Sequence, residues 1–241
     1  LIPMAEMLGF FIGGSAATSG AVRLARAHTG RERIIRCGYH GWHDWTQPEG
    51  IGVPEFVGQL TLSVPYGDLS ALEECFRKHD NQIACVVMET IQGDGPSEGF
   101  LQGCVDIAHR YGALCVFDET KVGFRVAYSG GSEYYGVAPD LATFGKACCN
   151  GYPGSFVVGR KEILSSKSCQ SAWLAATFHC DLPSLVALEV LLLRHPQCSH
   201  EQGGGFDDTS AGYPEPRPWR TVLAGSSVDR WIVAVVRDLL R

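Results

Sequence analysis

Short apolar runs alternate along this chain with stretches of helical periodicity, and this alternation is what most constrains the fold. The runs are apolar throughout, as in strands that are buried on both faces of a parallel sheet. Five strands are predicted, at Arg33–Cys37, Cys85–Thr90, Ala113–Asp118, Leu141–Phe144 and Ser155–Gly159. We therefore expect an α/β domain with a mostly parallel central sheet, whose functional residues lie beyond the carboxyl ends of the strands.

Four helices are predicted between and after these strands, and capping residues mark their ends. Gly30 and Gly112 follow two of them, and Asp68 precedes a third. The predicted helices are Ala16–His28, Leu69–His79, Leu101–Tyr111 and Pro183–Arg194. Beyond residue 195 the chain is rich in Gly and Pro, which indicates loop, and Val228–Arg241 is predicted to form one terminal helix.

Composition excludes several classes of function. The net charge of -6 argues against a nucleic-acid partner held by a broad basic surface. No apolar run reaches the length of a membrane span, about 18 residues, and we expect no membrane contact. The ten cysteines include no CxxC pair, so neither a zinc ribbon nor a thioredoxin motif is predicted. Their scatter suggests a reducing, cytoplasmic environment.

Two carboxylates close one apolar strand in Phe117-Asp118-Glu119. A buried carboxylate costs several kcal/mol unless it is paired with a cation or hydrogen-bonded. One interpretation is a strand-end carboxylate that caps the next turn. The other is a counter-ion for a cationic ligand such as a protonated pyridine nitrogen.

Lys146 follows the apolar strand 141–144 through Gly145 and precedes three small residues. A lone lysine is ordinarily a surface residue whose stem packs on apolar neighbours. The functional interpretation is a Schiff-base lysine, for which we expect partial burial to lower the amine pKa so that the neutral form attacks an aldehyde. The lysine alone leaves both interpretations open.

Two further segments fit a planar ligand that carries a phosphate. Gly13-Gly14-Ser15-Ala16 opens a predicted helix, where free backbone N–H groups donate to an anion. Tyr39-His40-Gly41-Trp42-His43 follows a strand and supplies rings that stack on a planar group. The two histidines match no common zinc spacing, so no metal site is predicted.

In this order, these segments resemble the class-III aminotransferases, a family of pyridoxal-phosphate (PLP) enzymes of fold type I, and within it the glutamate-1-semialdehyde 2,1-aminomutase branch. The most specific motifs are DETKVGFR at 118–125, PDLATFGK at 139–146 and NGYP at 150–153. The resemblance implies that residues 1–195 form the PLP-binding large domain of that fold. Residues 196–241 would then be a remnant of the C-terminal small domain.

The resemblance also implies roles for the residues at the sheet edge. Lys146 matches the lysine that holds PLP as a Schiff base, and Asp118 matches the aspartate that pairs with the pyridine nitrogen. Tyr39 matches the aromatic residue that stacks on the ring. His40, next to it, is included among the expected cofactor-binding residues.

Other matching positions concern the phosphate and the partner subunit. Gly14 and Ser15 match the phosphate-binding turn, and Thr120 occupies the position that packs under the ring. Thr177 matches a threonine that reaches the cofactor phosphate of the neighbouring subunit. This match implies a homodimer whose active site lies at the interface.

The chain departs from the family pattern at several positions. Ala16 stands where members carry an acidic residue, Thr120 where they carry valine, and Glu89-Thr90 where they carry Glu-Pro. Members also extend further at both ends, so we expect this chain to be truncated. The resemblance implies a PLP-dependent aminotransferase or aminomutase acting on an amino acid or amino-aldehyde. The alternative is a truncated, inactive paralogue that still dimerises and binds PLP.

Overall fold

The computed structural model describes residues 2–172, 174, 177, 178 and 181–198. Seven strands form one sheet in the order β1-β7-β6-β5-β4-β2-β3. The strands are β1 (Met7–Ile12), β2 (Arg33–Cys37), β3 (Thr61–Ser63), β4 (Ile83–Glu89), β5 (Leu114–Asp118), β6 (Leu141–Phe144) and β7 (Gly154–Gly159). Neighbouring strands from β3 to β6 pair in parallel, whereas β7 is antiparallel to both β6 and β1.

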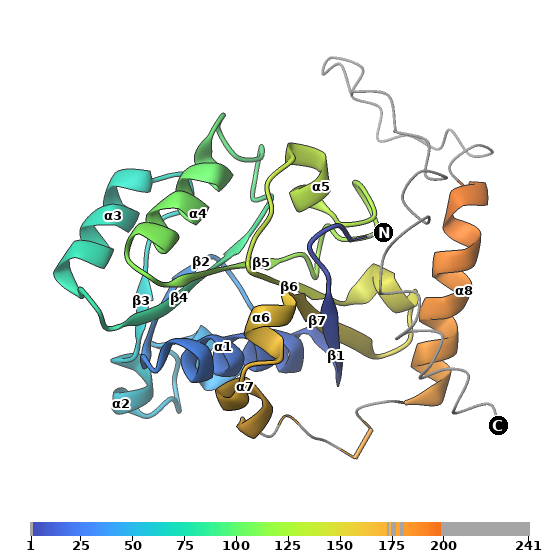
Figure 1. The fold of residues 1–241 in the computed structure, drawn as a ribbon, viewed down its shortest axis with the longest axis horizontal. Coiled ribbons are helices and arrows are strands. Elements are labelled where there is room, and N and C mark those ends of the chain that lie inside the picture. The colour runs from blue at the N-terminus through green and yellow to red at the C-terminus, as the bar shows by residue number, and fades with distance from the viewer. Residues whose placement is uncertain (1, 173, 175–176, 179–180, 199–241) are drawn as a thin grey trace.

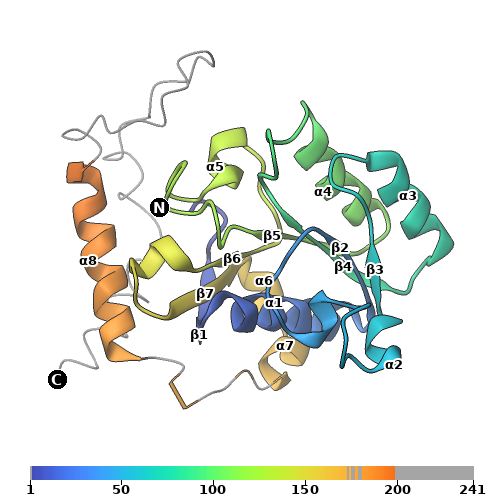
Figure 2. The same cartoon turned by 180° about the vertical axis from the view of Figure 1, so that it is seen from behind.

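Helices cover both faces of this sheet (Figures 1 and 2). One face carries α1 (Gly14–Thr29), α6 (Lys161–Leu164) and α7 (Lys167–Ser171), and the other carries α3 (Leu69–Lys78) and α4 (Phe100–Arg110). The long helix α8 (Leu182–Cys198) packs beside β7 at one end of the molecule. Shorter elements complete the described fold: α2 (Glu55–Gly58), α5 (Gly131–Tyr135) and the 3-10 turns η1 (Asp44–Thr46) and η2 (Lys146–Cys149).

The core lies on both sides of the central strands because their side chains are apolar in both directions. In β4 every residue from Ile83 to Met88 is buried, and all of β5 is buried. One apolar cluster joins these strands to α3 and α4, and a second joins them to α1. This rigid middle holds the carboxyl ends of β4, β5 and β6 side by side.

The predicted α/β fold with a mostly parallel sheet is confirmed, and all five predicted strands are present with ends shifted by at most two residues. Strands β1 and β3 were not predicted. β3 has only three residues, and β1 contains Gly9 and lies at the sheet edge, so neither shows the buried-strand pattern. The four predicted helices are α1, α3, α4 and α8, and α8 continues to Cys198.

Gly30 ends α1 in the left-handed conformation, as predicted for a glycine after a helix. Asp68 caps α3 by accepting a hydrogen bond from the Ala71 N–H at 2.8 Å. The predicted helix Val228–Arg241 and nearly all of the expected remnant 196–241 lie outside the described residues. No helix in the described part of the chain is both long and apolar enough to cross a bilayer.

Candidate active site

The candidate site lies where β4, β5 and β6 end. These strands are neighbours in the sheet, and their register places Glu89 opposite Asp118 and Asp118 opposite Thr143. Gly145 and Lys146 follow directly after β6. Parallel pairing thus brings residues that are far apart in the sequence to one edge of the sheet, since Glu89 and Lys146 are 57 positions apart.

Asp118 is the best-anchored side chain at this edge. It is only 4% exposed, and its carboxylate accepts three hydrogen bonds. His40 Nδ1 lies 2.9 Å from Oδ2, while Thr143 Oγ1 and the Thr120 N–H lie 3.0 and 3.1 Å from Oδ1. Burial opposes ionisation, but the hydrogen bond and charge of His40 and the bond from the Thr120 N–H outweigh it, so the pKa of Asp118 lies below its usual value. Asp118 is therefore ionised at neutral pH.

His40 joins this carboxylate to the aromatic segment. The imidazole is 1% exposed and lies nearly parallel to the Trp45 ring, with 6.3 Å between centroids and 7° between planes. Its carbonyl oxygen accepts a hydrogen bond from Thr18 Oγ1 at 2.8 Å, which ties the segment to α1. Within the part of the chain that the structure describes, His40 Nε2 is buried without a hydrogen-bond partner. An unsatisfied buried nitrogen of this kind indicates a missing polar partner.

The start of α1 approaches the same place. A Cβ at Gly14 would lie 2.7 Å from Thr120 Cγ2, and a Cβ at Gly145 would lie 3.0 Å from the same methyl group and 3.7 Å from Gly14 Cα. Three segments therefore lie close together: the start of α1, the turn after Asp118 and the residue before Lys146. α1 has no side-chain cap and no acidic residue in its first turn, so its free N–H groups keep their capacity for an anion.

Ser15 belongs to this convergence as well. Its Oγ accepts a hydrogen bond from the Trp42 N–H at 3.2 Å. Gly41 has φ of 110°, and a side chain there would collide with Ser15. The glycine at 41 therefore permits close packing of the aromatic segment on the first turn of α1.

Lys146 opens the turn η2 in a left-handed backbone conformation, with φ of 49°. For a residue with a side chain, this conformation costs about 1–2 kcal/mol. Strain of this kind persists where the surrounding structure enforces it, commonly at functional sites. The residue is exposed, so the expectation that Lys146 is partly buried is wrong in this structure. The backbone turn at η2, and not burial of the side chain, fixes the position of Lys146 after β6.

Two aromatic rings of the predicted segment face outward. Tyr39 is 62% exposed and Trp42 is 71% exposed, and the Trp42 and His43 rings form a T-shaped pair. Thr177 is also exposed. Among the described residues, no hydrogen bond joins Thr177 to the other predicted site residues. Its predicted role concerns a second subunit and stays a prediction.

Sequence reasoning missed Thr143 and gave Glu89 no role at the site. Thr143 is fully buried and donates to Asp118 Oδ1, and Glu89 ends β4 directly opposite Asp118. Burial raises the pKa of Glu89, and the charges of His40, Lys121 and Lys146 lower it in part. Thr143 and Glu89 can be assigned to the site only from the register between neighbouring strands. The sequence carries no direct signal for that register.

Glu119, the second residue of the acidic pair, is a strand-end carboxylate that caps the following turn. It is fully buried and accepts hydrogen bonds from the Gly131 and Ser132 N–H groups at 3.0 and 2.8 Å and from Thr90 Oγ1 at 2.9 Å. It thereby caps the start of α5 and closes the loop that follows Asp118. No group of three or more metal-ligating side chains gathers in the described residues.

Comparison with known proteins shows what this chain is similar to. The family model "Aminotransferase class-III" matches residues 1–194. The glutamate-1-semialdehyde 2,1-aminomutase of Methanocaldococcus jannaschii is 36% identical over 205 residues, which cover 77% of this chain and 48% of that protein. The enzyme of the same name from Sulfurihydrogenibium azorense is 40% identical over 178 residues, which cover 66% of this chain and 42% of that protein. The chain thus spans less than half the length of these relatives.

Solved structures agree with this result. The FumI protein of Sphingopyxis sp. MTA144, solved in a PLP form, superposes with a TM-score of 0.77 at 28% identity over 81% of this chain and 49% of that one. An omega-transaminase from Sphaerobacter thermophilus gives a TM-score of 0.71 at 27% identity over 79% of this chain and 50% of that one. The predicted family, and PLP as the cofactor of that family, are confirmed. The chain belongs to the class-III aminotransferases.

Proposed function

We propose that this chain binds PLP and acts as a PLP-dependent aminotransferase or aminomutase on an amino acid or amino-aldehyde. The observation that carries the proposal is Asp118, a buried and ionised carboxylate with three hydrogen bonds at the edge where Gly14, Thr120 and Gly145 meet. A carboxylate kept ionised by its surroundings suits a cationic ring nitrogen.

The residues present fit this cofactor. His40 Nε2 is a buried nitrogen beside the anchored carboxylate, and no described residue hydrogen-bonds to it. Gly14 and Ser15 supply N–H groups at a helix start that suit a phosphate, and the exposed ring of Tyr39 is free to stack on a planar group. Bound PLP would supply an aldehyde, which the amine of Lys146 would hold, and a ring that withdraws electrons from the substrate carbon.

The chain's own groups then have distinct tasks. Asp118 holds a negative charge against the ring nitrogen, and His40 and Thr143 keep that carboxylate in place through their hydrogen bonds. Lys146, exposed at the start of η2, would supply the amine that accepts a proton from the substrate α-carbon and delivers it to the carbon at which the product is protonated. The proposal includes a homodimer, in which Thr177 contacts the phosphate bound to the other subunit.

Two activities share this machinery. An aminomutase retains its intermediate in a closed site, and an aminotransferase releases it, and groups around the entrance decide between them. An inactive paralogue that dimerises and binds PLP without turnover is the alternative, favoured by Ala16 in the first turn of α1.

The test is a spectrum of the purified protein with added PLP, followed by borohydride reduction and peptide mapping. We expect a yellow protein with the cofactor fixed on Lys146. Lys146→Ala should lose the fixed cofactor, while Lys167→Ala, which changes an exposed lysine on α7, should retain it. A colourless protein that takes up no PLP would overturn the proposal. PLP uptake without amino transfer would favour the inactive paralogue.

A further inference from the structure

Two adjacent cysteines end the turn that Lys146 begins, and the proposed function gives them no task. Cys148 is fully buried and Cys149 is 2% exposed. Their sulfur atoms lie 3.7 Å apart, and Cys148 Sγ also lies 3.5 Å from the Gly154 carbonyl oxygen. The turn η2 and β7 thus hold two thiols side by side.

The two thiols are not equivalent. The Cys148 S–H donates to Cys149 Sγ, and this bond, together with the Gly154 backbone and against the effect of burial, lowers the pKa of Cys149. The same bond and burial raise the pKa of Cys148. Cys149 therefore has the greater thiolate character, and the thiolate is the nucleophile and the ligand for soft elements.

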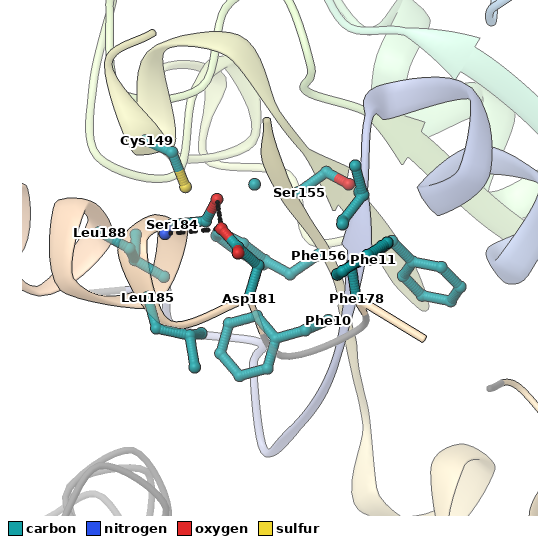
Figure 3. A pocket seen from close by; sticks show the side chains of 12 residues that line it. Phe10, Phe11, Cys149, Ser155, Phe156, Phe178, Asp181, Ser184, Leu185 and Leu188 are labelled. Atoms are coloured by element: carbon teal, nitrogen blue, oxygen red, sulfur yellow. Dashed lines mark hydrogen bonds between the residues drawn. The ribbon is translucent and has the colours of Figure 1, made fainter. Parts of the chain in front are cut away.

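Cys149 borders a small hollow. This hollow lies between β1, β7 and the start of α8, and Cys149 lines it together with Ser184 and Asp181. Figure 3 shows its sulfur directed toward Ser184 and Asp181 across this hollow. Of the two cysteines, Cys149 lines the hollow, and Cys148 Sγ lies 3.7 Å from Cys149 Sγ.

Geometry decides what the pair can hold. Adjacent residues joined by a trans peptide have Cα atoms about 3.8 Å apart, whereas disulfides span about 4.4–6.8 Å, so a direct S–S bond is strained. An atom about 2.3 Å from each sulfur, as in a zinc thiolate, bridges the observed 3.7 Å at an angle of about 107°. The described residues supply no third metal-ligating side chain here. The pair thus suits a trivalent atom that binds two protein sulfurs and is already bonded to one organic group.

We propose that Cys148 and Cys149 form a dithiol site for trivalent organic arsenicals. An oxide of the type R–As=O has one substituent and two bonds to exchange. Two As–S bonds form and the As=O bond breaks, and the two thiol protons leave with the oxygen as one water molecule. Arsenic stays trivalent, so no oxidant or reductant is required.

The test treats the 241-residue chain, without PLP, with phenylarsine oxide in the presence of excess 2-mercaptoethanol, which strips arsenic from single thiols. Tryptic cleavage after Lys146 and Arg160 yields a peptide, residues 147–160, whose only cysteines are this pair. We expect one phenylarsenic group per chain, carried on this peptide and removed by a dithiol such as 2,3-dimercaptopropanol. Retention on a different peptide, or no retention, would overturn the proposal.

Single variants add a second readout. Cys148→Ser and Cys149→Ser should each lower retained arsenic at least tenfold, because one thiol cannot form both bonds. Cys75→Ser is the matched control, since Cys75 is only partly buried and has no second sulfur at contact distance among the described residues. Full retention in both serine variants would overturn the proposal, and the peptide map of the unaltered chain decides the question even if a variant fails to fold.

Discussion

His40 Nδ1 lies 2.9 Å from Asp118 Oδ2, and the two residues are 78 positions apart in the sequence. Both are buried, and His40 is the stronger of the influences that keep the pKa of Asp118 low against the effect of burial. The contact joins the loop after β2 to the end of β5. A carboxylate fixed in this way cannot turn away from a ligand at the sheet edge.

His40→Ala should therefore weaken PLP binding. The change leaves Asp118 with its bonds from Thr143 and Thr120 and removes a hydrogen bond to a charged group, worth about 1.5–3 kcal/mol. We expect the dissociation constant for PLP to rise at least tenfold, measured by titration of the cofactor absorbance. His28→Ala, which changes an exposed histidine on α1, should bind as the unaltered chain does. Equal affinities in all three proteins would contradict the role given to His40.

Gly14→Ala should disturb the convergence around Thr120. The new Cβ would lie 2.7 Å from Thr120 Cγ2, which is closer than atoms normally approach, and such overpacking costs about 1–3 kcal/mol. We expect a lower unfolding free energy in urea and weaker PLP binding. Gly9→Ala is the matched control because its nearest neighbour would lie at an ordinary 3.9 Å.

A second substitution sharpens this prediction. Thr120→Ser deletes the methyl group that meets position 14, so the double variant Gly14→Ala with Thr120→Ser should recover most of the lost stability. The losses of unfolding free energy in the single variants Gly14→Ala and Thr120→Ser should thus not add up in the double variant, as expected for residues in contact. Additive losses would show that Gly14 is required for another reason.

Much of the fold follows from the sequence because buried parallel strands and capped helices leave clear local patterns. Asp118 and Lys146 stand out because each follows an apolar strand, and the sheet then places them at one edge. Thr143 could not be found in the same way, because its bond to Asp118 depends on the register of β5 against β6. Register is set by packing across the whole sheet, not by any one strand.

The exposure of Lys146 could not be predicted from the residues around it in the sequence either. An apolar strand before the lysine and small residues after it favoured partial burial, but Lys146 has a left-handed backbone, with φ of 49°, and is exposed. A non-glycine residue in that conformation gives no sequence signal, since glycine or asparagine is the usual occupant.

Stability should depend on pH through Glu119. Burial raises its pKa from 4.5 to about 7, although its three hydrogen bonds oppose the shift. The folded state then binds this proton more tightly than the unfolded state, so the contribution is complete below 4.5 and is lost as the pH rises toward 7. The loss amounts to about 3 kcal/mol at 1.36 kcal/mol for each pKa unit.

Urea unfolding at about pH 5 and about pH 8 tests this linkage. Glu119→Gln removes the titration but places an amide where backbone N–H groups donate, so it should be the less stable protein at low pH. The difference in unfolding free energy between Glu119→Gln and the unaltered chain should shrink at the higher pH, because the unaltered chain then contains a buried charge. Glu98→Gln, at an exposed position, should follow the unaltered chain at both pH values. A disadvantage that is constant with pH would show that the pKa of Glu119 is not raised.

Tyr39 offers a final test of the proposed cofactor position. Its ring is 62% exposed next to the buried His40, so it is available to a planar ligand without displacing other side chains. Tyr39→Phe keeps the ring and should bind PLP as well as the unaltered chain, whereas Tyr39→Ala should lose about tenfold in affinity, since aromatic stacking contributes about 0.5–1.5 kcal/mol beyond buried area. Phe56→Ala, which removes a similarly exposed ring on α2, should have no effect. Loss of affinity in the phenylalanine variant would mean that the hydroxyl, not the ring, contacts the cofactor.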